Sequence, residues 1–435
     1  MIDVFDIRDY GAIVNGIADD TNAIQLALND IKSNSGGTLY FPKGITKING
    51  TTQIDMTGFA GQIIFSGDGG SSSIHITSTG PDSVFYIANS PLVNVQNLTF
   101  VGTGNTGIDM TQSLFWFNVC EMSKVSNCRF IGLALTAPID PTFSLNKWYG
   151  LLVGRQTNLV VEGSQFGGCS TANCPSIEVE DYYSLTIRDT QFVDWGAYQS
   201  GVRIKTGWQT NSYWIRALNA DEPQDGFRRD KVILENITMD EGNNQTIYID
   251  DVGSVELNSV HANAGNSPIL SSIDIKNVNH VNITDSSVHQ VNYAATNGVN
   301  LENCDEVVIE NLKLEGIIDK LNITGTTKRV KIRNSDGVNI INTANAFIDA
   351  DQIMQVTPSN NLVKPLGTVT HITGTTQLTN IDPTNFKVGD IITLIFDNYT
   401  PVVTTGNIKL YCGLNITATP GKRVTLIYDG TNFYE

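Results

Sequence analysis

Short stretches in which apolar and polar residues alternate recur along most of the chain. Nine of them can be aligned, namely VNVQNLTF (93–100), SKVSNCRF (123–130), LVVEGSQF (159–166), LTIRDTQF (185–192), VILENITM (232–239), VELNSVHA (255–262), VNITDSSV (281–288), VVIENLKL (307–314) and VKIRNSDG (330–337). Alternation with a period of two predicts half-buried β-strands. A turn-forming residue holds the same place in every copy: Asn97, Asn127, Gly163, Asp189, Asn236, Ser259, Asp285, Asn311 and Asn334. Repetition near 25 residues predicts a β-solenoid.

A second, shorter strand is expected eight to ten residues before each copy. The candidates are VFYI (84–87), LFWF (114–117), GLLV (150–153), SIEV (176–179), GVRI (201–204), TIYI (246–249), SIDI (272–275) and GVNL (298–301). Stacked coils would place their outward side chains in columns about 4.8 Å apart. The first predicted column is Tyr86, Trp116, Leu152, Glu178, Arg203, Tyr248, Asp274 and Asn300. The second is Ala88, Asn118, Gly154, Glu180, Lys205, Asp250, Lys276 and Glu302.

The two ends of the chain depart from this repeat. Near the N-terminus, Asp20 or Thr21 can N-cap a helix. Its apolar positions follow a 3.6-residue period: Ala23, Ile24, Leu26, Ala27, Leu28 and Ile31. After residue 345 the repeat is lost, and strands separated by glycine-rich turns predict a small β-sandwich or barrel-like module over 346–435.

Three sequence motifs carry a resemblance to a known superfamily. The chain opens with D-Y-G-A, then D-D-T-x-A-I, then G-G-x-L-x-F-P-x-G, all within residues 1–50. This opening resembles the pectate-lyase-like superfamily, which is common in phage tailspikes. The resemblance implies an all-β fold: a right-handed single-stranded parallel β-helix over 51–345, with an N-terminal helical cap over 1–50. The end of the chain, VTLIYDGTNFYE, resembles C-terminal modules of phage tail proteins, which implies trimerisation or glycan contact.

Composition and charge limit the kinds of partner that this chain can bind. A formal net charge of −17 argues against nucleic acid, whose phosphates require a basic face. No run of 18 apolar residues is present, so no membrane insertion is expected. The opening residues do not form a signal peptide. We therefore expect synthesis in a host cytoplasm and a place on a virion tail or outside the cell.

The candidate catalytic residues lie on the predicted coils between residues 176 and 276. Glycoside hydrolysis requires two carboxylates, about 5–5.5 Å apart for retention and about 6.5–9.5 Å apart for inversion. Four candidate catalytic residues follow: Glu178, Glu180, Asp250 and Asp274. Glu180 and Asp250 would lie two coils apart, about 9.6 Å, whereas Glu178 and Glu180 share one strand. Asp274, three coils from Glu178, would need loop closure to reach it. No metal and no cofactor are expected.

Binding residues are expected on the same columns and in two insertions near 132–150 and 207–230. Long loops on a regular scaffold usually carry function or subunit contacts. Aromatic rings suit pyranose faces, so the predicted substrate-binding set is Trp116, Arg203, Lys205, Trp208, Trp214 and Tyr248. The strand SGVRIKTG is similar to the basic strand of polygalacturonases. The paired aspartates and the histidine of that family are missing from the preceding coils, so its catalysis cannot be carried over.

The resemblance and the paired carboxylates together predict a tailspike-type depolymerase. We expect it to cleave a bacterial surface polysaccharide (capsule, exopolysaccharide or teichoic-type polymer), preferably by hydrolysis. A lyase using Arg203, Lys205 and Tyr248 is one alternative. A non-catalytic receptor-binding or structural tail protein is another, since fold alone cannot separate these functions. A homotrimer is expected, and a virion adaptor is a further possible partner.

Overall fold

The structure is a computed structural model of the 435-residue chain. It describes residues 3–49, 52–57, 59–77, 83–102, 113–131, 149–154, 158–167, 177–180, 182–193, 215–218, 231–239, 247–264, 271–290, 298–315, 320–335, 339–342, 344, 346–350, 354–356, 362–363, 365, 368–384, 386–411 and 413–435. For a few of these, among them 178, 180 and 215–218, only the backbone is described.

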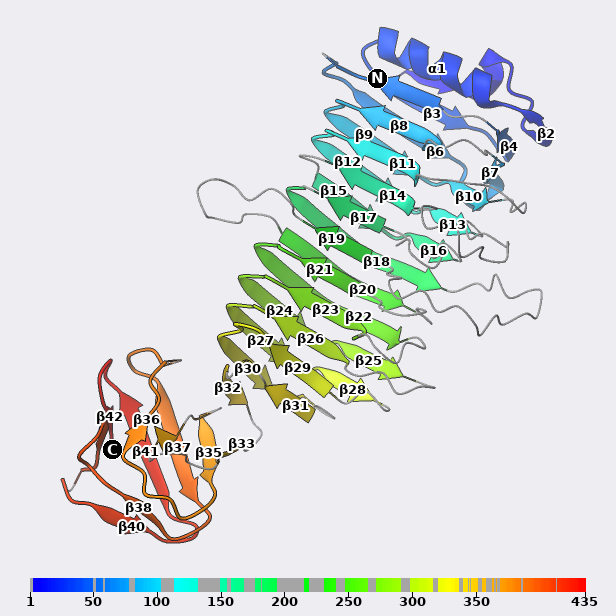
Figure 1. Ribbon diagram of the computed structural model, residues 1–435. Coiled ribbons are helices and arrows are strands. Elements are labelled where there is room, and N and C mark those ends of the chain that lie inside the picture. The colour runs from blue at the N-terminus through cyan, green and yellow to red at the C-terminus, as the bar shows by residue number, and fades with distance from the viewer. Residues whose placement is uncertain are drawn as a thin grey trace, which may run out of the picture.

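Most of the chain is a parallel β-solenoid, which confirms the predicted fold class (Figure 1). One wall, called sheet B here, contains eleven parallel strands. These are β5 (Thr52–Asp55), β8 (Phe85–Ala88), β11 (Ser113–Asn118), β14 (Tyr149–Gly154), β17 (Ile177–Glu180), β19 (Ile215–Leu218), β21 (Ile247–Asp250), β23 (Ile273–Lys276), β26 (Val299–Glu302), β29 (Lys320–Thr324) and β31 (Asn339–Asn342).

The rest of the solenoid wall is a 21-stranded sheet, called sheet A, which bends into two faces. The first face contains β1 (Val4–Asp6), β3 (Gly37–Phe41), β6 (Gln62–Gly67), β9 (Leu92–Gln96), β12 (Met122–Ser126), β15 (Asn158–Glu162), β18 (Ser184–Val193), β20 (Lys231–Met239), β22 (Ser254–Ala264), β24 (His280–Thr284), β27 (Glu306–Glu310), β30 (Arg329–Arg333) and β32 (Phe347–Ala350). The second face contains β2 (Asn15–Asp19), β4 (Gly44–Ile48), β7 (Ser72–Ile76), β10 (Thr99–Gly102), β13 (Arg129–Ile131), β16 (Gln165–Gly167), β25 (Ser287–Gln290), β28 (Lys313–Glu315) and the second halves of β18, β20 and β22.

The bend between the two faces of sheet A is made by the predicted turn column. All nine predicted turn residues, from Asn97 to Asn334, have a positive φ between 48° and 56°. L-residues adopt this left-handed conformation at a cost that asparagine, aspartate and glycine tolerate best. The recurring Asn, Asp or Gly in the sequence is therefore the cause of the bend.

Replacing one turn residue is expected to lower stability by a small, defined amount. Asn97 has φ 55°, and Asn97→Ala should lower the free energy of unfolding by about 1 kcal/mol, because alanine pays the full left-handed penalty. Asn97→Gly removes the same side chain without that penalty and serves as the control. Chemical denaturation measures both. Equal losses in the two variants would show that the side chain, not the backbone conformation, matters.

The interior of the solenoid is filled by stacked apolar side chains. Phe100, Phe130, Phe166 and Phe192 lie in successive coils, with ring centroids 5.1, 4.5 and 5.1 Å apart and ring planes within 14° of parallel. All four are fully buried. Offset stacking adds to the free energy of burial, so this column is a major source of solenoid stability.

The N-terminal cap is built as predicted, with one correction. The helix α1 (Thr21–Ser33) covers the open end of the solenoid beside β3 and β5 (Figure 1). Five of the six predicted apolar positions are buried, whereas Leu26 is 45% exposed and therefore lies outside the core. A 3₁₀ turn, η1 (Ile7–Tyr10), lies between β1 and β2, ahead of α1. A second such turn, η2 (Gly69–Ser71), precedes β7. Asp20, almost fully buried, accepts backbone hydrogen bonds from Ile13 and Lys47 instead of capping the helix with its side chain.

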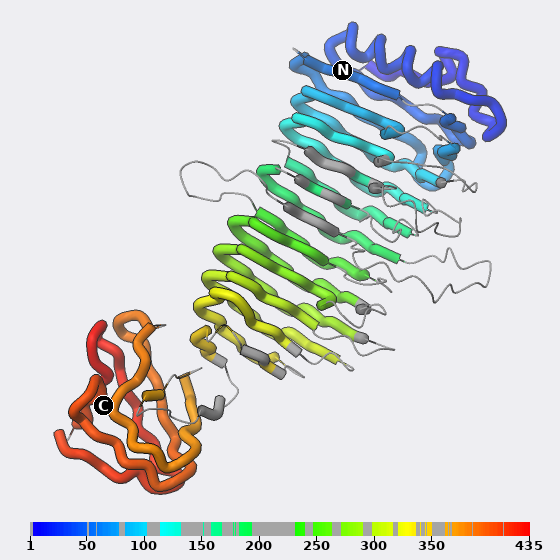
Figure 2. Tube along the Cα trace, in the orientation of Figure 1, coloured from blue at the N-terminus to red at the C-terminus, as the bar shows by residue number. Residues whose placement is uncertain are grey.

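The C-terminal residues form a separate β module with its own core. Its main sheet contains β33 (Met354–Val356), β35 (Val369–Ile372), β37 (Ile391–Phe396), β41 (Arg423–Tyr428), β42 (Phe433–Tyr434) and β39 (Ile408–Lys409). Two small sheets pair β34 (Leu362–Val363) with β36 (Asn380–Ile381), and β38 (Thr400–Val402) with β40 (Ile416–Ala418). The last solenoid strand, β32, still pairs with β30, so sheet A runs past the predicted boundary at 345. Figure 2 shows the Cα trace of the solenoid and of the module.

Charged pairs join the module to the last coils. Arg329 binds Asp390 through two hydrogen bonds of 2.9 and 3.1 Å, and Lys387 lies 2.9 Å from Glu306. Lys387 lowers the pKa of Glu306. Burial alone would raise the pKa of Asp390, but the hydrogen bonds from Arg329 and from the Lys387 backbone, together with the charges of both residues, outweigh it and lower that pKa. A carboxylate with a lowered pKa stabilises the fold above its unfolded-state pKa and loses that contribution as the pH falls.

Docking of the module is therefore expected to weaken as the pH falls below about 4, where these carboxylates become protonated. The thermal unfolding midpoint of the module, followed by calorimetry, should fall between pH 6 and pH 3. Arg329→Met should reduce this pH dependence. Lys328→Met is the matched control, because Lys328 pairs with the exposed Asp305. An unchanged pH dependence in Arg329→Met would exclude the pair as its source.

Candidate active site on sheet B

The outward residues of sheet B follow from the strand register. The first column is Gln53, Tyr86, Trp116, Leu152, Glu178, Arg216, Tyr248, Asp274, Asn300, Asn322 and Ile341. The second is Asp55, Ala88, Asn118, Gly154, Glu180, Leu218, Asp250, Lys276, Glu302 and Thr324. All four predicted catalytic residues occupy these columns.

One place in sheet B is held by a different strand from the one predicted. Between β17 and β21 the solenoid uses β19, so Arg216 and Leu218 hold the places predicted for Arg203 and Lys205. The insertion predicted at 207–230 therefore contains a strand of the sheet. Arg203 and Lys205 themselves lie outside the described residues, as do Trp208, Trp214 and the insertion at 132–148. The alternating residues of 201–204 and of 215–218 suit a strand equally, and coil length alone does not choose between them.

An aromatic pair stands at the N-terminal side of the columns. Tyr86 and Trp116 lie on adjacent strands with ring centroids 4.9 Å apart in an edge-to-face arrangement. Asn118 donates a hydrogen bond of 3.0 Å to the Tyr86 hydroxyl, which fixes that ring. Both rings are half-buried and point outward, as predicted. The part of each ring that faces outward offers flat apolar surface to a sugar ring.

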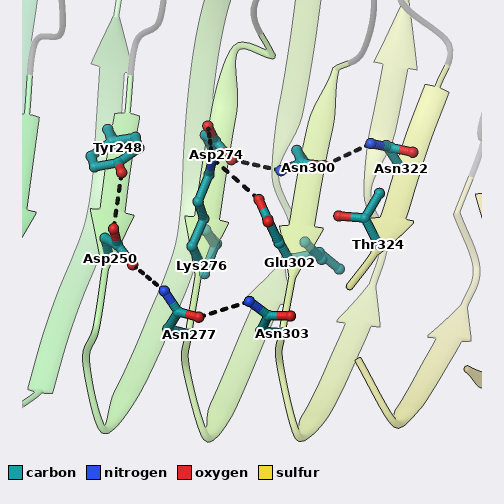
Figure 3. A network of polar contacts seen from close by, with 12 residues as sticks. Tyr248, Asp250, Asp274, Lys276, Asn277, Asn300, Glu302, Asn303, Asn322 and Thr324 are labelled. Carbon is teal, nitrogen blue, oxygen red and sulfur yellow. Dashed lines mark hydrogen bonds and ion pairs between the residues drawn. The ribbon is translucent and has the colours of Figure 1, made fainter. Parts of the chain in front are cut away.

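Asp250 stands further along the second column and is held by two neighbours (Figure 3). The Tyr248 hydroxyl donates to one oxygen at 3.0 Å, and the Asn277 amide donates to the other at 2.7 Å. Asn303 in turn donates to Asn277 at 2.9 Å. These bonds fix the carboxylate plane of Asp250, while its side chain stays partly exposed.

Asp274, Lys276 and Glu302 form a charged group on the next two strands (Figure 3). Asp274 is only 6% exposed and accepts a 2.7 Å hydrogen bond from Asn300, which accepts another of 2.7 Å from Asn322. Lys276 lies 3.6 Å from Asp274 and 3.2 Å from Glu302. Burial alone would lower the pKa of Lys276, but the two carboxylates outweigh it and raise that pKa. The lysine is therefore a fixed, compensated cation.

The register sets the spacing of the carboxylates. Glu180 and Asp250 are two strands apart, as predicted, with the Leu218 position between them. This corresponds to about 9.6 Å between backbones. Asp250 and Asp274 are diagonal neighbours on adjacent strands, which corresponds to about 7–8 Å. The side chains of Glu178 and Glu180 are outside the description, so their contacts are not part of this geometry.

Comparisons with known proteins show a similarity in sequence over one short segment and a similarity in fold to several solved structures. No family model matches the chain. Mannuronan C5-epimerase AlgE1 of Azotobacter vinelandii is 39% identical over 46 residues, which is 11% of this chain and 3% of the enzyme. AlgE3 of the same organism is 41% identical over 46 residues, or 2% of its length. The chain thus spans a few per cent of the curated relatives it matches.

Solved structures with a similar fold include tailspikes, an adhesin and glycosidases. Tailspike protein 3 of bacteriophage CBA120 is 12% identical with a TM-score of 0.45, covering 98% of this chain and 66% of that chain. The surface adhesin PfbA of Streptococcus pneumoniae is 12% identical (TM-score 0.44, 99% and 99%). A GH87 α-1,3-glucanase of Streptomyces thermodiastaticus is 12% identical (TM-score 0.44, 80% and 68%). At this identity the likeness concerns the fold alone.

A second turn column beside sheet B was not predicted. Asn89, Val119, Asp251, Asn277, Asn303 and Gly325, each following a strand of sheet B, have positive φ between 52° and 65°. Two of these asparagines form the chain of hydrogen bonds that ends on Asp250. The signal was present in the sequence, because Asn or Asp follows four of these strands directly.

The described residues hold no other candidate centre on sheet B. A polar hollow lies instead on the bend of sheet A, where Gly163 leaves out one side chain of the turn column. Its lining is Asn127, Glu162, Gly163, Arg188, Asp189, Glu235 and Asn236. No three metal-ligating side chains come together among the residues that the structure describes. No helix in the same part of the chain is long and apolar enough to cross a membrane.

Proposed function

We propose that the outer face of sheet B binds a polysaccharide along the solenoid axis and hydrolyses it. The observation that carries this proposal is the register, which brings a half-buried, outward-facing aromatic pair and six carboxylate positions onto the same two columns. Strands repeat at about 4.8 Å, close to the length of one sugar unit, so consecutive sugars can meet consecutive strands. The substrate class is a bacterial surface polysaccharide, as the N-terminal motifs imply.

Asp250 is assigned one of the two catalytic roles. It is partly exposed, and its plane is fixed by Tyr248 and Asn277. Glu180 is assigned the other role, because it holds the same column two strands away, with an uncharged residue, Leu218, at the place between them. A spacing near the upper end of about 6.5–9.5 Å favours inversion. Glu178 remains a reserve acid beside Glu180, and buried Asp274 is assigned to positioning Lys276 and Asn300.

A glycan-binding protein without catalysis is the second candidate. Every carboxylate of sheet B whose side chain is described, namely Asp55, Asp250, Asp274 and Glu302, is bonded to a neighbouring side chain. Such saturation favours a structural or receptor-binding role. Elimination by a lyase that uses Arg203, Lys205 and Tyr248 stays an alternative, although Arg216 and Leu218 hold the column places predicted for the two bases.

Incubation with purified surface polysaccharides from candidate hosts separates these functions. New reducing ends without ultraviolet absorbance from an unsaturated uronate support hydrolysis. Reducing ends together with that absorbance indicate elimination. Binding without either signal supports the non-catalytic glycan-binding protein. If the protein neither binds nor cleaves any polysaccharide of a broad panel, the proposed function is wrong.

Assembly belongs to the same proposal. The motifs at both ends imply a homotrimer on a virion tail, attached through an adaptor protein. Light scattering of the purified chain tests the trimer, and co-purification with virion tail proteins tests the adaptor.

A further inference from the structure

We propose that the sheet B site selects an uncharged run of sugars and excludes polymers that carry a carboxylate on every sugar. This inference rests on the proposed function, because it names the substrate class of the same site. It starts from the charge that the register places on the strands from β17 to β26.

These five strands present more acids than bases. Five outward positions are carboxylates, namely Glu178, Glu180, Asp250, Asp274 and Glu302, and two are cations, Arg216 and Lys276. The formal charge of this surface is therefore −3. A polyuronate lying along the columns would bring one carboxylate close to each coil, and like charges at that spacing repel strongly near a protein surface.

The one described cation on these strands is already committed. Lys276 lies between Asp274 and Glu302, at 3.6 and 3.2 Å, and its ammonium group is also 5.9 Å from the centre of the Tyr248 ring. A uronate would have to displace one of these carboxylates and leave it uncompensated, which costs more than the new pair returns. Among the described side chains of these strands, no cation is therefore left to pair with an acidic sugar.

Groups suited to neutral sugars occupy the same columns. The Tyr86 and Trp116 rings supply apolar faces, and the half-buried Asn322 supplies an amide on β29. Neutral pyranoses are bound by ring stacking and by hydrogen bonds to amides and carboxylates, without a salt bridge.

The test compares oligosaccharides that differ only at the carboxylate. Pairs of equal linkage and length, galactan with galacturonan and glucan with glucuronan, are titrated against the full-length protein at fixed ionic strength. The neutral member is expected to bind, and its uronate counterpart is expected to bind at least tenfold more weakly.

Glu302→Gln supplies the decisive variant, because it releases Lys276 from one carboxylate. The uronate members should gain affinity by about threefold to fivefold, the value of one partly exposed ion pair. Glu315→Gln is the matched control. Glu315 also pairs with a lysine, Lys313, and with His289, but it lies on sheet A, so neither affinity should change.

The possible outcomes distinguish a failure of this inference about substrate charge from a failure of the proposed function itself. Neutral preference with a uronate gain in Glu302→Gln supports the inference. Equal or tighter binding of the uronate members in the wild type overturns it and leaves the proposed function standing. Binding of no member of any pair, combined with no cleavage of host polysaccharides, removes the proposed function and the inference together.

Discussion

Substituting Asp250 by asparagine is expected to lower the rate of polysaccharide cleavage by about 10²–10⁴-fold, the usual contribution of a general acid or base. Asparagine has nearly the same size and can keep one of the hydrogen bonds to Tyr248 and Asn277, so the fold should persist. The amide cannot accept or release a proton at neutral pH, so proton transfer is lost. Reducing-end release per minute, with the thermal midpoint as a check on folding, measures the effect.

Asp285→Asn is the matched control for this substitution. Asp285 accepts a 2.7 Å hydrogen bond from Asn311, the same distance as between Asp250 and Asn277, but it stands on the bend of sheet A. Replacing the carboxylate of Asp285 by an amide should leave the rate of polysaccharide cleavage unchanged. If Asp250→Asn retains wild-type cleavage, Asp250 is not catalytic, and the hydrolytic role moves to the pair Glu178 and Glu180 or fails with it.

The second large effect concerns stability. Phe166→Ala should lower the free energy of unfolding by about 3–5 kcal/mol, because it removes a fully buried ring from the middle of the phenylalanine stack. The neighbouring rings of Phe130 and Phe192 cannot close the gap, since both are attached to strands fixed by the sheet A register. Chemical denaturation of the purified variants gives the difference.

The variant Phe166→Leu distinguishes the contribution of ring stacking to stability from the contribution of apolar burial. Leucine keeps most of the apolar volume but no ring, so we expect a loss well below that of the alanine variant. A leucine variant as unstable as the alanine variant would assign the effect to ring stacking. An alanine variant within about 1 kcal/mol of wild type would contradict the claim that the stack stabilises the solenoid.

The repeat was predictable from sequence because its signal is a backbone requirement. Each bend of sheet A needs a left-handed residue, and only a few residue types meet that need cheaply. The sequence did not predict β19 at this place in sheet B, and the reason is different. Two stretches in one 47-residue coil carry a strand pattern, and insertions on either side of β19 absorb the difference in length. Pattern and spacing therefore fit both.

The hydrogen-bond chains ending on Asp250 and Asp274 were not predicted, although Asp250, Asp274 and Asn300 were placed in their columns from the sequence. Asn300 was placed in its column from the sequence, but its role depends on Asn322, which lies one strand further, beyond the aligned set. Asn277 falls outside the alternating pattern, because it is the turn residue after the strand. Side-chain partners across coils depend on register to one residue, which composition and periodicity do not supply.

The coil from Asn277 to Glu302 shows how such a protein can change during evolution. It begins with a left-handed asparagine, at φ 52°, and the next coil begins with another, Asn303, at φ 57°. Duplicating or deleting those 26 residues would rejoin equivalent backbone positions, so every column would keep its alignment while the face grew or shrank by one strand. The length of this face can therefore be inherited in whole steps, and recombination between related genes can exchange its outward side chains without disturbing the fold.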